Sequence, residues 1–341
     1  MKKLLSVLAF AGLCQFAQAQ SLPRSTPAAE KVSEKGIEDY VAAFKQKGED
    51  IHSFMVLRHG KVVAEQYFGD NSATKPHVMW SVSKTFTATA IGFAVQEKLL
   101  TVNDKVIKYF PNDLPPEVSK NLQQLEIRHL LTMTNGQPTE PRPADFPNQS
   151  WEKTFFALSI VNEPGTKFYY NSYATYMLSS ILQKVTGKTV LEYLTPRLFQ
   201  PLGIEGAVWD SNPAGVSYGG WGLHIKTEDM AKMGQFILQK GTWNGKQLLA
   251  AKWFDEATRA HIVQSPQWVQ PNADITVSDW SQGYGYQMWR CRHNAFRADG
   301  KDGQFIIIIP EKDAVIVTTA NVQNMQEEIN LIWDHLLAGL E

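Results

Sequence analysis

The sequence predicts an α+β fold: an antiparallel β-sheet built from both termini with flanking helices, plus an inserted, mainly helical region. Two β-type runs joined by turn residues lie near the N-terminus, and several more follow Gly283. Between them, apolar residues recur at helical spacing and Pro and Gly are frequent. We therefore expect one domain over residues 35–341, with an α/β part at residues 35–84 and 281–341 and a helical insertion at residues 85–280.

The first 19 residues have the pattern of a secretory signal peptide. Met1-Lys-Lys precedes a short apolar run, which is followed by the small-x-small site Ala17-Gln-Ala19. Cleavage after Ala19 would remove Cys14; a lipid anchor on Cys14 is the alternative, but the bulky Leu13 suits a lipidation site poorly. We expect a periplasmic or secreted protein in which residues 20–34 form a tether.

The elements of the N-terminal part are predicted from periodicity. Residues 36–47 carry apolar side chains at helical spacing. Residues 54–58 and 61–68 are β-type runs separated by the turn pair His59-Gly60, which indicates a hairpin.

The rest of the chain is predicted to hold helices in its middle and strands toward its C-terminus. Helices are predicted over residues 127–134, 173–186, 191–199 and 227–239. Strands are predicted over residues 284–291, 295–298, 304–309 and 314–319, followed by a last helix over residues 326–340.

Composition narrows the classes of function. The mature chain would keep one cysteine, Cys291, so it would form no internal disulfide. Its stability would come from a hydrophobic core, for which a content of 43% hydrophobic residues is ample. No second apolar stretch approaches the roughly 20 residues needed to cross a bilayer. The formal net charge of −1 gives no electrostatic reason to bind nucleic acid or anionic membranes. A small-molecule or peptide-like substrate is the expected partner.

Ser81 and Lys84 are the strongest chemical signal. Residues three apart on a helix share a face, so an amine can take the proton of a serine hydroxyl that attacks a carbonyl. Lysine is a base only when neutral, so its pKa would have to lie well below the ordinary value of about 10.4. The run after Lys84 carries no charge until Glu97, which predicts a helix enclosed by protein.

Other chemistries have weaker support. Ser217 lies in a Gly-x-Ser-x-Gly pattern, but a nucleophile elbow needs a buried strand before it and a helix after it, and neither is predicted there. The eight histidines have no metal-ligand spacing, and no phosphate-binding glycine motif occurs. We therefore expect neither a metal nor a cofactor; His129 fits a structural role, and His224 either that or a wall of the cleft.

Five motifs together resemble the serine β-lactamase and penicillin-binding-protein superfamily, on its class C and esterase side, and most of all its 6-aminohexanoate-dimer hydrolase-like branch. They are Trp80-Ser-Val-Ser-Lys-Thr-Phe, Ile127-Arg-His-Leu-Leu-Thr-Met-Thr-Asn-Gly, Pro164-Gly-Thr-Lys-Phe-Tyr-Tyr-Asn-Ser, Gly220-Trp-Gly-Leu-His-Ile-Lys-Thr-Glu-Asp-Met-Ala and Gly300-Lys-Asp-Gly-Gln-Phe. The resemblance covers nearly all of the mature chain.

The resemblance implies a proton relay at Tyr170, beside Ser81 and Lys84. Such a phenol can act in two forms: as a tyrosinate with a depressed pKa beside a lysine ammonium, or as a neutral acid that protonates the leaving group. Family members commonly carry Tyr-x-Asn here. This chain has Ser172 in the third place, which has less reach than an asparagine.

The resemblance also implies a cleft strand that ends at Gly300, with the backbone amides of Ser81 and Lys301 as the oxyanion hole. Ala298 replaces the cationic residue usual in this strand, so a β-lactam carboxylate would lose its partner unless Lys301 substitutes. Trp221 is expected in a loop that borders the same cleft.

These observations predict a secreted serine hydrolase that cleaves an amide or ester through a Ser81 acyl-enzyme. A class C-type β-lactamase or D-amino-acid peptidase ranks next, because of Ser172 and Ala298. A catalytically silent peptide-binding module is the alternative from another class. Its signature would be the loss of Ser81, Lys84 or Tyr170, and all three are present.

Overall fold

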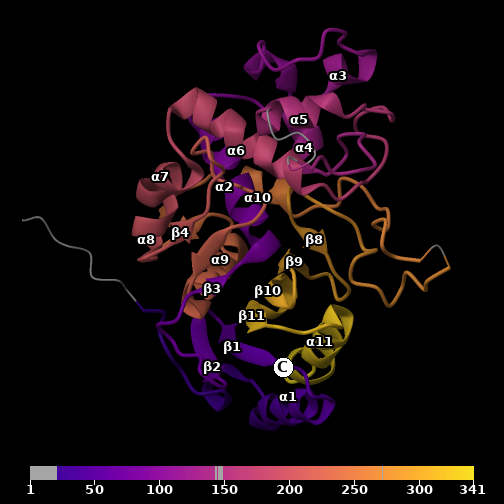
Figure 1. Cartoon of the computed structure of the whole chain (residues 1–341). Coiled ribbons are helices and arrows are strands. Elements are labelled where there is room, and N and C mark those ends of the chain that lie inside the picture. The colour runs from indigo at the N-terminus through magenta and orange to yellow at the C-terminus, as the bar shows by residue number, and fades with distance from the viewer. Residues whose placement is uncertain (1–20, 143, 145–148, 271) are drawn as a thin grey trace, which may run out of the picture.

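The central sheet draws its strands from both ends of the chain. The computed structural model describes residues 21–142, 144, 149–270 and 272–341 (Figure 1). Six antiparallel strands lie in the order β2-β1-β11-β10-β9-β8. Their bounds are β1 Ile51–Arg58, β2 Lys61–Tyr67, β8 Trp289–Arg290, β9 Phe296–Gly300, β10 Gln304–Ile309 and β11 Ala314–Ala320. Since β1 pairs with β11, the N-terminal hairpin joins the C-terminal strands, and the predicted fold class is confirmed.

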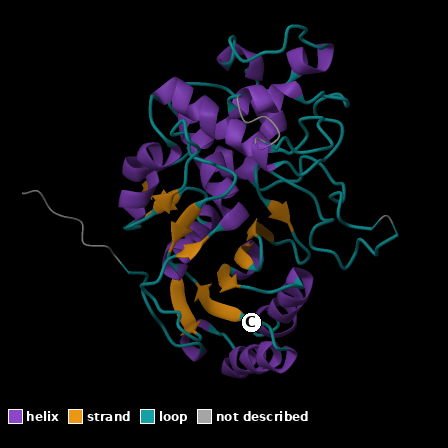
Figure 2. Cartoon of the chain, in the orientation of Figure 1, coloured by secondary structure: helices purple, strands orange, loops and turns teal. Residues whose placement is uncertain are grey.

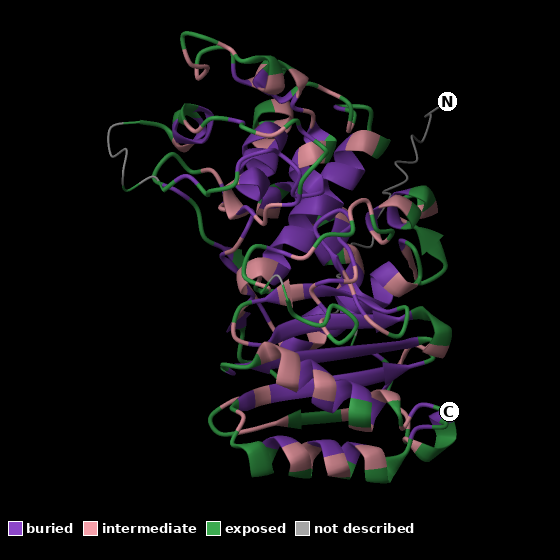
Figure 3. Cartoon of the chain, turned by 90° about the vertical axis from the view of Figure 1, so that its right-hand side faces the viewer, coloured by how far each residue is buried: buried purple, intermediate pink, exposed green. Residues whose placement is uncertain are grey.

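Helices cover both faces of this sheet. α1 (Glu34–Lys47) and α11 (Met325–Leu331), which continues into the π-helical turn η7 (Ile332–Leu337), pack with Phe305, Ile307 and Ile309 on one face. α9 (Thr227–Leu238) packs with Ile306 and Ile308 on the other face. Alternate residues of β10 thus enter two separate cores, which explains its unbroken apolar run. Figure 3 shows the buried strands above α1, whose outer side remains exposed.

The remaining helices form a second region above the sheet (Figure 2). They are α2 Ser83–Gln96, α3 Lys120–Gln124, α4 Ile127–Leu131, α5 Trp151–Ala157, α6 Ser172–Thr186, α7 Val190–Leu194, α8 Gln200–Leu202 and α10 Ala251–Ala257, with the π-helical turn η5 Thr195–Phe199. Short 3₁₀ turns are η1 Ala28–Glu30, η2 Trp80–Val82, η3 Val106–Tyr109 and η6 Pro310–Lys312. α2 is buried along nearly its whole length, as its charge-free sequence predicts.

Small strands border the helical region. β3 (His77–Val78), β5 (Leu223–Ile225) and β4 (Val208–Trp209) form a three-stranded sheet, and β6 (Thr242–Trp243) pairs with β7 (Lys246–Gln247). Because β4, β5, β6 and β7 lie within residues 85–280, and α9 packs on the main sheet, the helical insertion is less uniform than predicted. In the part of the chain that the structure describes, no helix is both long enough and apolar enough to span a bilayer.

Several predicted elements differ in length. The strand expected over residues 284–291 is reduced to Trp289–Arg290, because Gln287 has a positive φ of 58° and its side-chain amide donates to the carbonyls of Leu130 and Leu131. The helix expected to reach residue 134 ends at Leu131, since Met133 has a φ of 57°. The predicted hairpin is confirmed: His59 and Gly60 both have positive φ, the geometry that a tight two-residue turn needs.

The segment before α1 is packed against the domain, so the predicted tether is wrong over residues 21–34. Leu22 is 6% exposed and belongs to the main core, and Arg24 forms ion pairs with Glu65 and Glu228. Glu30 is buried, forms an ion pair with Lys61 and is hydrogen-bonded to the His59 ring. These contacts fasten the segment to β2 and α9. The predicted signal peptide, residues 1–19, lies outside the described residues.

Candidate active site

Ser81 lies in the 3₁₀ turn η2, immediately before α2, and Lys84 lies in the first turn of α2. The Lys84 Nζ and Ser81 Oγ atoms are 2.8 Å apart, within hydrogen-bond distance. Trp80, the residue before Ser81, has a φ of 44°, an uncommon value for a bulky residue and one found preferentially at functional sites. The pair that the sequence predicts is therefore formed, at a constrained start of a buried helix.

Lys84 is almost fully enclosed, with 1% of its surface exposed. Besides Ser81, its Nζ contacts the carbonyl oxygen of Gly220 at 2.8 Å and the Ser172 Oγ at 3.2 Å. Burial lowers the pKa of Lys84 to about 7, although the carboxylates of Glu140 and Asp299 act in the opposite sense. A substantial fraction of this amine is neutral near pH 7, which is the state a base requires.

Tyr170 lies beside both Ser81 and Lys84. Its ring centroid is 4.9 Å from the Lys84 Nζ, and the ring stacks on Trp289 at 5.6 Å. Burial raises the pKa of Tyr170, and hydrogen bonding with the Ser81 side chain offsets only part of this effect. Of the two forms considered for this residue, the raised pKa favours the neutral phenol over the tyrosinate.

The strand β9 brings its last residue, Gly300, against the segment that carries Ser81. A Cβ added at Gly300 would lie 2.4 Å from the Met79 carbonyl oxygen and 3.3 Å from Val82 Cγ2. Lys301 follows and lines the same cavity as Ser81. Only a residue without a side chain permits this approach, which brings the end of β9 against the segment that carries Ser81.

Two neighbours of Gly300 have different surroundings. Ala298 is fully buried in the main core, so it presents no group to the cleft. Asp299, which sequence reasoning missed, lines the Ser81 cavity and pairs with Arg297 at 2.7 Å. Its position in the strand, between Ala298 and Gly300, was the signal available, since alternate residues of a strand face opposite sides.

The other two residues predicted for the cleft, Ser172 and Trp221, make different contacts. Ser172 begins α6 and contacts Lys84, while its backbone N–H donates to the Glu140 carboxylate. Trp221 follows Gly220 in the same loop and its ring stacks on that of Tyr218 at 4.8 Å; its assignment to the cleft stays a prediction. The preceding residue, Gly220, is the one that contacts Lys84 through its carbonyl. The loop that carries Gly220 thus contacts Lys84 through its backbone.

The remaining candidates contribute no further chemistry. Ser217 is buried, forms an isolated bridge with Ser211 and lacks the strand–turn–helix of a nucleophile elbow. His129 caps its own helix by accepting from the Glu126 backbone N–H, in keeping with a structural role. Among the described residues, no group of three or more His, Cys, Asp or Glu side chains is placed to hold a metal ion.

The comparison with known proteins agrees with this geometry. The Beta-lactamase family model matches residues 39–339. The chain belongs to the Beta-lactamase family. The 6-aminohexanoate-dimer hydrolase of Paenarthrobacter ureafaciens is 24% identical over 286 residues, covering 78% of this chain and 71% of that protein.

Two solved structures share the β-lactamase fold with this chain. A putative 6-aminohexanoate-dimer hydrolase from Bacillus anthracis superposes with a TM-score of 0.70 at 20% identity, covering 94% of this chain and 87% of the other. EstCE1, a hydrolase with promiscuous acyltransferase activity, superposes with a TM-score of 0.69 at 17% identity, covering 91% and 99%. These likenesses concern the fold, and they agree with the family that the sequence match gives.

Gly300→Ala tests whether the close approach of β9 matters in this β-lactamase-family site. The added methyl group would push β9 away from Met79, and displacements near 1 Å can reduce a rate about a hundredfold. We expect kcat/KM for p-nitrophenyl butyrate to fall by about tenfold to a hundredfold in the folded protein. Gly234→Ala is the control, because its Cβ would lie 2.4 Å from Val315 Cγ1 on the sheet. An equal loss in both variants would contradict a specific role for Gly300.

Proposed function

We propose that this protein is a serine hydrolase that cleaves an ester or amide bond through an acyl-enzyme on Ser81. The observation that carries the proposal is the buried Lys84 amine, 2.8 Å from the Ser81 Oγ and with a pKa lowered to about 7. A structural lysine gains little from such a position, because burying an ammonium group costs solvation free energy. A base that activates a nucleophile requires it.

In the proposed reaction, neutral Lys84 takes the Ser81 proton as the Oγ attacks the substrate carbonyl carbon. The developing oxyanion accepts hydrogen bonds from the backbone amides of Ser81 and Lys301. The neutral phenol of Tyr170, whose pKa is raised by burial, protonates the leaving amine or alkoxide directly or with Lys84. Water then attacks the acyl-enzyme, with the same groups moving the proton in reverse, and releases the acid.

Linear amides and esters are proposed as better substrates than β-lactams. Ala298 is buried and offers no cation, and the acidic Asp299 lines the cavity where a carboxylate would approach. The similarity to a 6-aminohexanoate-dimer hydrolase and to EstCE1 supports the same order. Turnover of nitrocefin faster than of p-nitrophenyl esters or linear amides would contradict it.

The site of action is proposed to be the periplasm or the exterior, because residues 1–19 have the pattern of a cleavable signal. N-terminal sequencing of the exported protein checks this, and Gln20 is the expected first residue.

Covalent labelling tests the reaction. A fluorophosphonate probe is expected to label the intact protein, and Ser81→Ala is expected to abolish labelling. Ser217→Ala is the matched control, because it removes the other serine that lies in a hydrolase-like pattern. An unlabelled protein with a verified fold, or labelling that survives Ser81→Ala, would overturn the proposal.

The pH dependence follows from Lys84. Protonation removes the base, so activity should be present above the pKa of about 7 and decline as the pH falls below it. We expect kcat/KM for p-nitrophenyl butyrate to drop about tenfold per pH unit below pH 6. A profile flat between pH 5 and pH 8 would contradict the assignment of Lys84 as the base.

A further inference from the structure

Three residues form the turn between β9 and β10, and the first is Lys301, whose backbone amide is the proposed second donor of the oxyanion hole. The other two, Asp302 and Gly303, have positive φ values of 64° and 92°. The chain therefore reverses sharply just after the residue whose amide the proposed reaction uses. A non-glycine residue such as Asp302 keeps a positive φ where surrounding contacts determine it.

Gln304, the first residue of β10, supplies one of these contacts through its side-chain amide. It is 3% exposed, and its Nε2 atom donates to the carbonyl oxygens of Lys301 at 3.0 Å and Ala320 at 2.7 Å. Its Oε1 atom accepts from the Ala320 backbone N–H at 3.1 Å. Both hydrogens of the amide nitrogen are thus used, and the two carbonyls that face this nitrogen determine which way the amide points.

This side chain replaces backbone pairing at the end of the sheet. The ladder between β10 and β11 ends at the pair Phe305 and Thr318. Just before Phe305, the Gln304 amide bonds both the N–H and the C=O of Ala320, because it offers the same donor and acceptor as a peptide group. The main chain of β10 can therefore leave the ladder and enter the turn, while the turn stays bonded to β11.

The other two carbonyls of the turn have donors as well. The Val322 backbone N–H donates to the carbonyl oxygen of Asp302 at 3.1 Å. The Thr318 hydroxyl donates to the carbonyl oxygen of Gly303 at 3.0 Å. Every carbonyl of the turn thus accepts a hydrogen bond from β10, from β11 or from the segment that follows β11.

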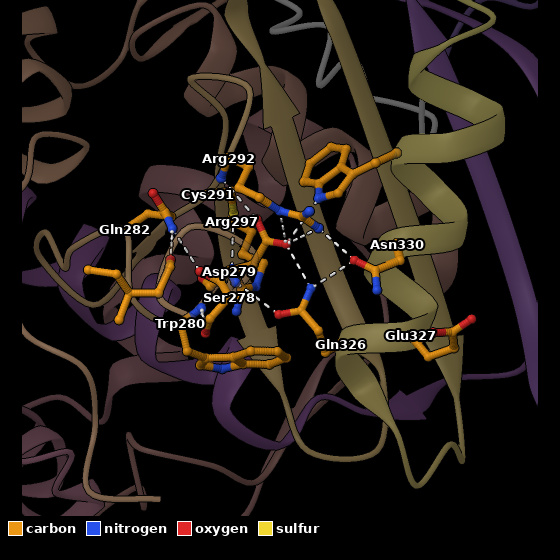
Figure 4. A network of polar contacts seen from close by, with 12 residues as sticks. Ser278, Asp279, Trp280, Gln282, Cys291, Arg292, Arg297, Gln326, Glu327 and Asn330 are labelled. Atoms are coloured by element: carbon orange, nitrogen blue, oxygen red, sulfur yellow. Dashed lines mark hydrogen bonds and ion pairs between the residues drawn. The ribbon is translucent and has the colours of Figure 1, made fainter. Parts of the chain in front are cut away.

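The segment that carries Val322 is held at its far end. It leads into α11, where the Gln326 side chain donates to the Asp279 carboxylate and accepts from the Asp279 backbone N–H, both at 2.8 Å (Figure 4). Met325, the residue before Gln326, lines the same cavity as Lys301. The turn and the helix beside it are bonded before a substrate enters, so little ordering cost accompanies binding.

Gln304 also supports the residue before the turn. A Cβ added at Gly300 would lie 3.0 Å from the Gln304 Cβ and 3.3 Å from Val82 Cγ2, so Gly300 lies between Gln304 and the segment that carries Ser81. The Lys301 N–H belongs to the peptide group that joins Gly300 to Lys301. The next peptide group contains the carbonyl that Gln304 bonds. One side chain thereby restricts the backbone on both sides of this N–H.

We propose that Gln304 is a positioning residue for the reaction, which holds the Lys301 amide where the oxyanion forms. The inference rests on the proposed function, in which the amides of Ser81 and Lys301 bind that oxyanion. Gln304 acts through Lys301 and takes no part in proton transfer. Loss of one oxyanion-hole donor reduces kcat by about a hundredfold to a thousandfold, so a displaced donor should cause part of that loss.

Gln304→Met tests this role, because it removes the three hydrogen bonds of the amide and keeps a chain of similar volume. We expect kcat for p-nitrophenyl butyrate to fall about tenfold to a hundredfold, with KM within about threefold of the wild-type value. A second readout reports on the oxyanion hole itself. It uses p-nitrophenyl thionobutyrate, in which a sulfur atom, a weak hydrogen-bond acceptor, replaces the carbonyl oxygen.

The preference of the wild-type protein for the oxygen ester over the thionoester should fall about tenfold in Gln304→Met. A partly unfolded sample would hydrolyse both esters more slowly and leave their ratio unchanged. Gln304→Asn guards against misfolding of Gln304→Met, since it keeps an amide on a chain one methylene shorter. It should lower the ratio about threefold.

Thr318→Val is the matched control, because it removes the hydrogen bond to Gly303 and leaves the one to the Lys301 carbonyl. Its ester ratio should stay within about twofold of the wild-type value. An unchanged ratio in both folded Gln304 variants, or an equal fall in Thr318→Val, would overturn the positioning role and leave a labelled Ser81 as the nucleophile. A wild-type protein that the fluorophosphonate probe does not label would overturn the hydrolase and the positioning role together.

Discussion

Lys84→Met is expected to reduce kcat/KM by about a hundredfold to ten-thousandfold while the protein remains folded. The variant removes the amine 2.8 Å from the Ser81 Oγ but keeps a chain of similar volume in the enclosed site. Among the described residues, the buried amine contacts neutral oxygens of Ser81, Ser172 and Gly220, so its loss should leave the melting temperature unchanged or raise it. Steady-state kinetics and thermal unfolding on the same sample measure both effects.

A second buried lysine supplies the control. Lys232 on α9 is 4% exposed and donates to the Gly203 carbonyl at 2.7 Å, remote from Ser81 in the contacts it makes. Lys232→Met should keep kcat/KM within about threefold, because it removes no group of the reaction. If Lys84→Met retained more than a tenth of the activity, another group would have to be the base.

Asp279→Ala is expected to lower the free energy of unfolding by about 3–5 kcal/mol, because it breaks a buried charge network. The carboxylate is fully buried and accepts from Arg292 Nε at 3.0 Å, Gln326 Nε2 at 2.8 Å and Trp333 Nε1 at 3.0 Å. Its removal leaves Arg292 without that ion pair and loosens the loop from α11. Urea unfolding, followed by tryptophan fluorescence, measures the change.

The decrease in the free energy of unfolding that Asp279→Ala causes should depend on pH. Burial raises the pKa of Asp279, but Arg297 and the hydrogen bonds from Arg292 and Gln326 outweigh burial, so its pKa lies below the ordinary value. This carboxylate therefore contributes stability above its unfolded-state pKa, and the contribution is lost as the pH falls through the folded-state value. The difference between wild type and Asp279→Ala should shrink on acidification.

Asp274→Ala is the matched control for Asp279→Ala. Asp274 lies in the same loop, is exposed, and its side chain accepts from the Thr276 hydroxyl and backbone N–H, at 2.6 and 2.9 Å. Its replacement should leave the urea unfolding midpoint unchanged, because an exposed side chain away from the network contributes little to stability. Similar losses in the two variants would contradict the network as the cause.

Much of the fold could be predicted because its signals are local. The turn pair His59-Gly60 fixes the first hairpin, and the run Ile306–Ile309 is apolar because both of its faces are covered. Predictions failed where contacts from distant residues override local preference. Gln287 interrupts an expected strand since its amide bonds to α4, and residues 21–34 resemble a tether but bury Leu22 against the core.

The sequence by itself determined the pair Ser81 and Lys84, since a spacing of three at the start of a helix brings two side chains together whatever surrounds them. Only the tertiary structure decided the protonation state of that pair. Gly220 and Ser172, which contact Lys84 from 136 and 88 residues away, enclose the amine and thereby lower its pKa. The cavity was decided in the same way: Trp268, Trp280, Trp289 and Asp299 have no shared local pattern, and long-range packing alone gathers them around Ser81.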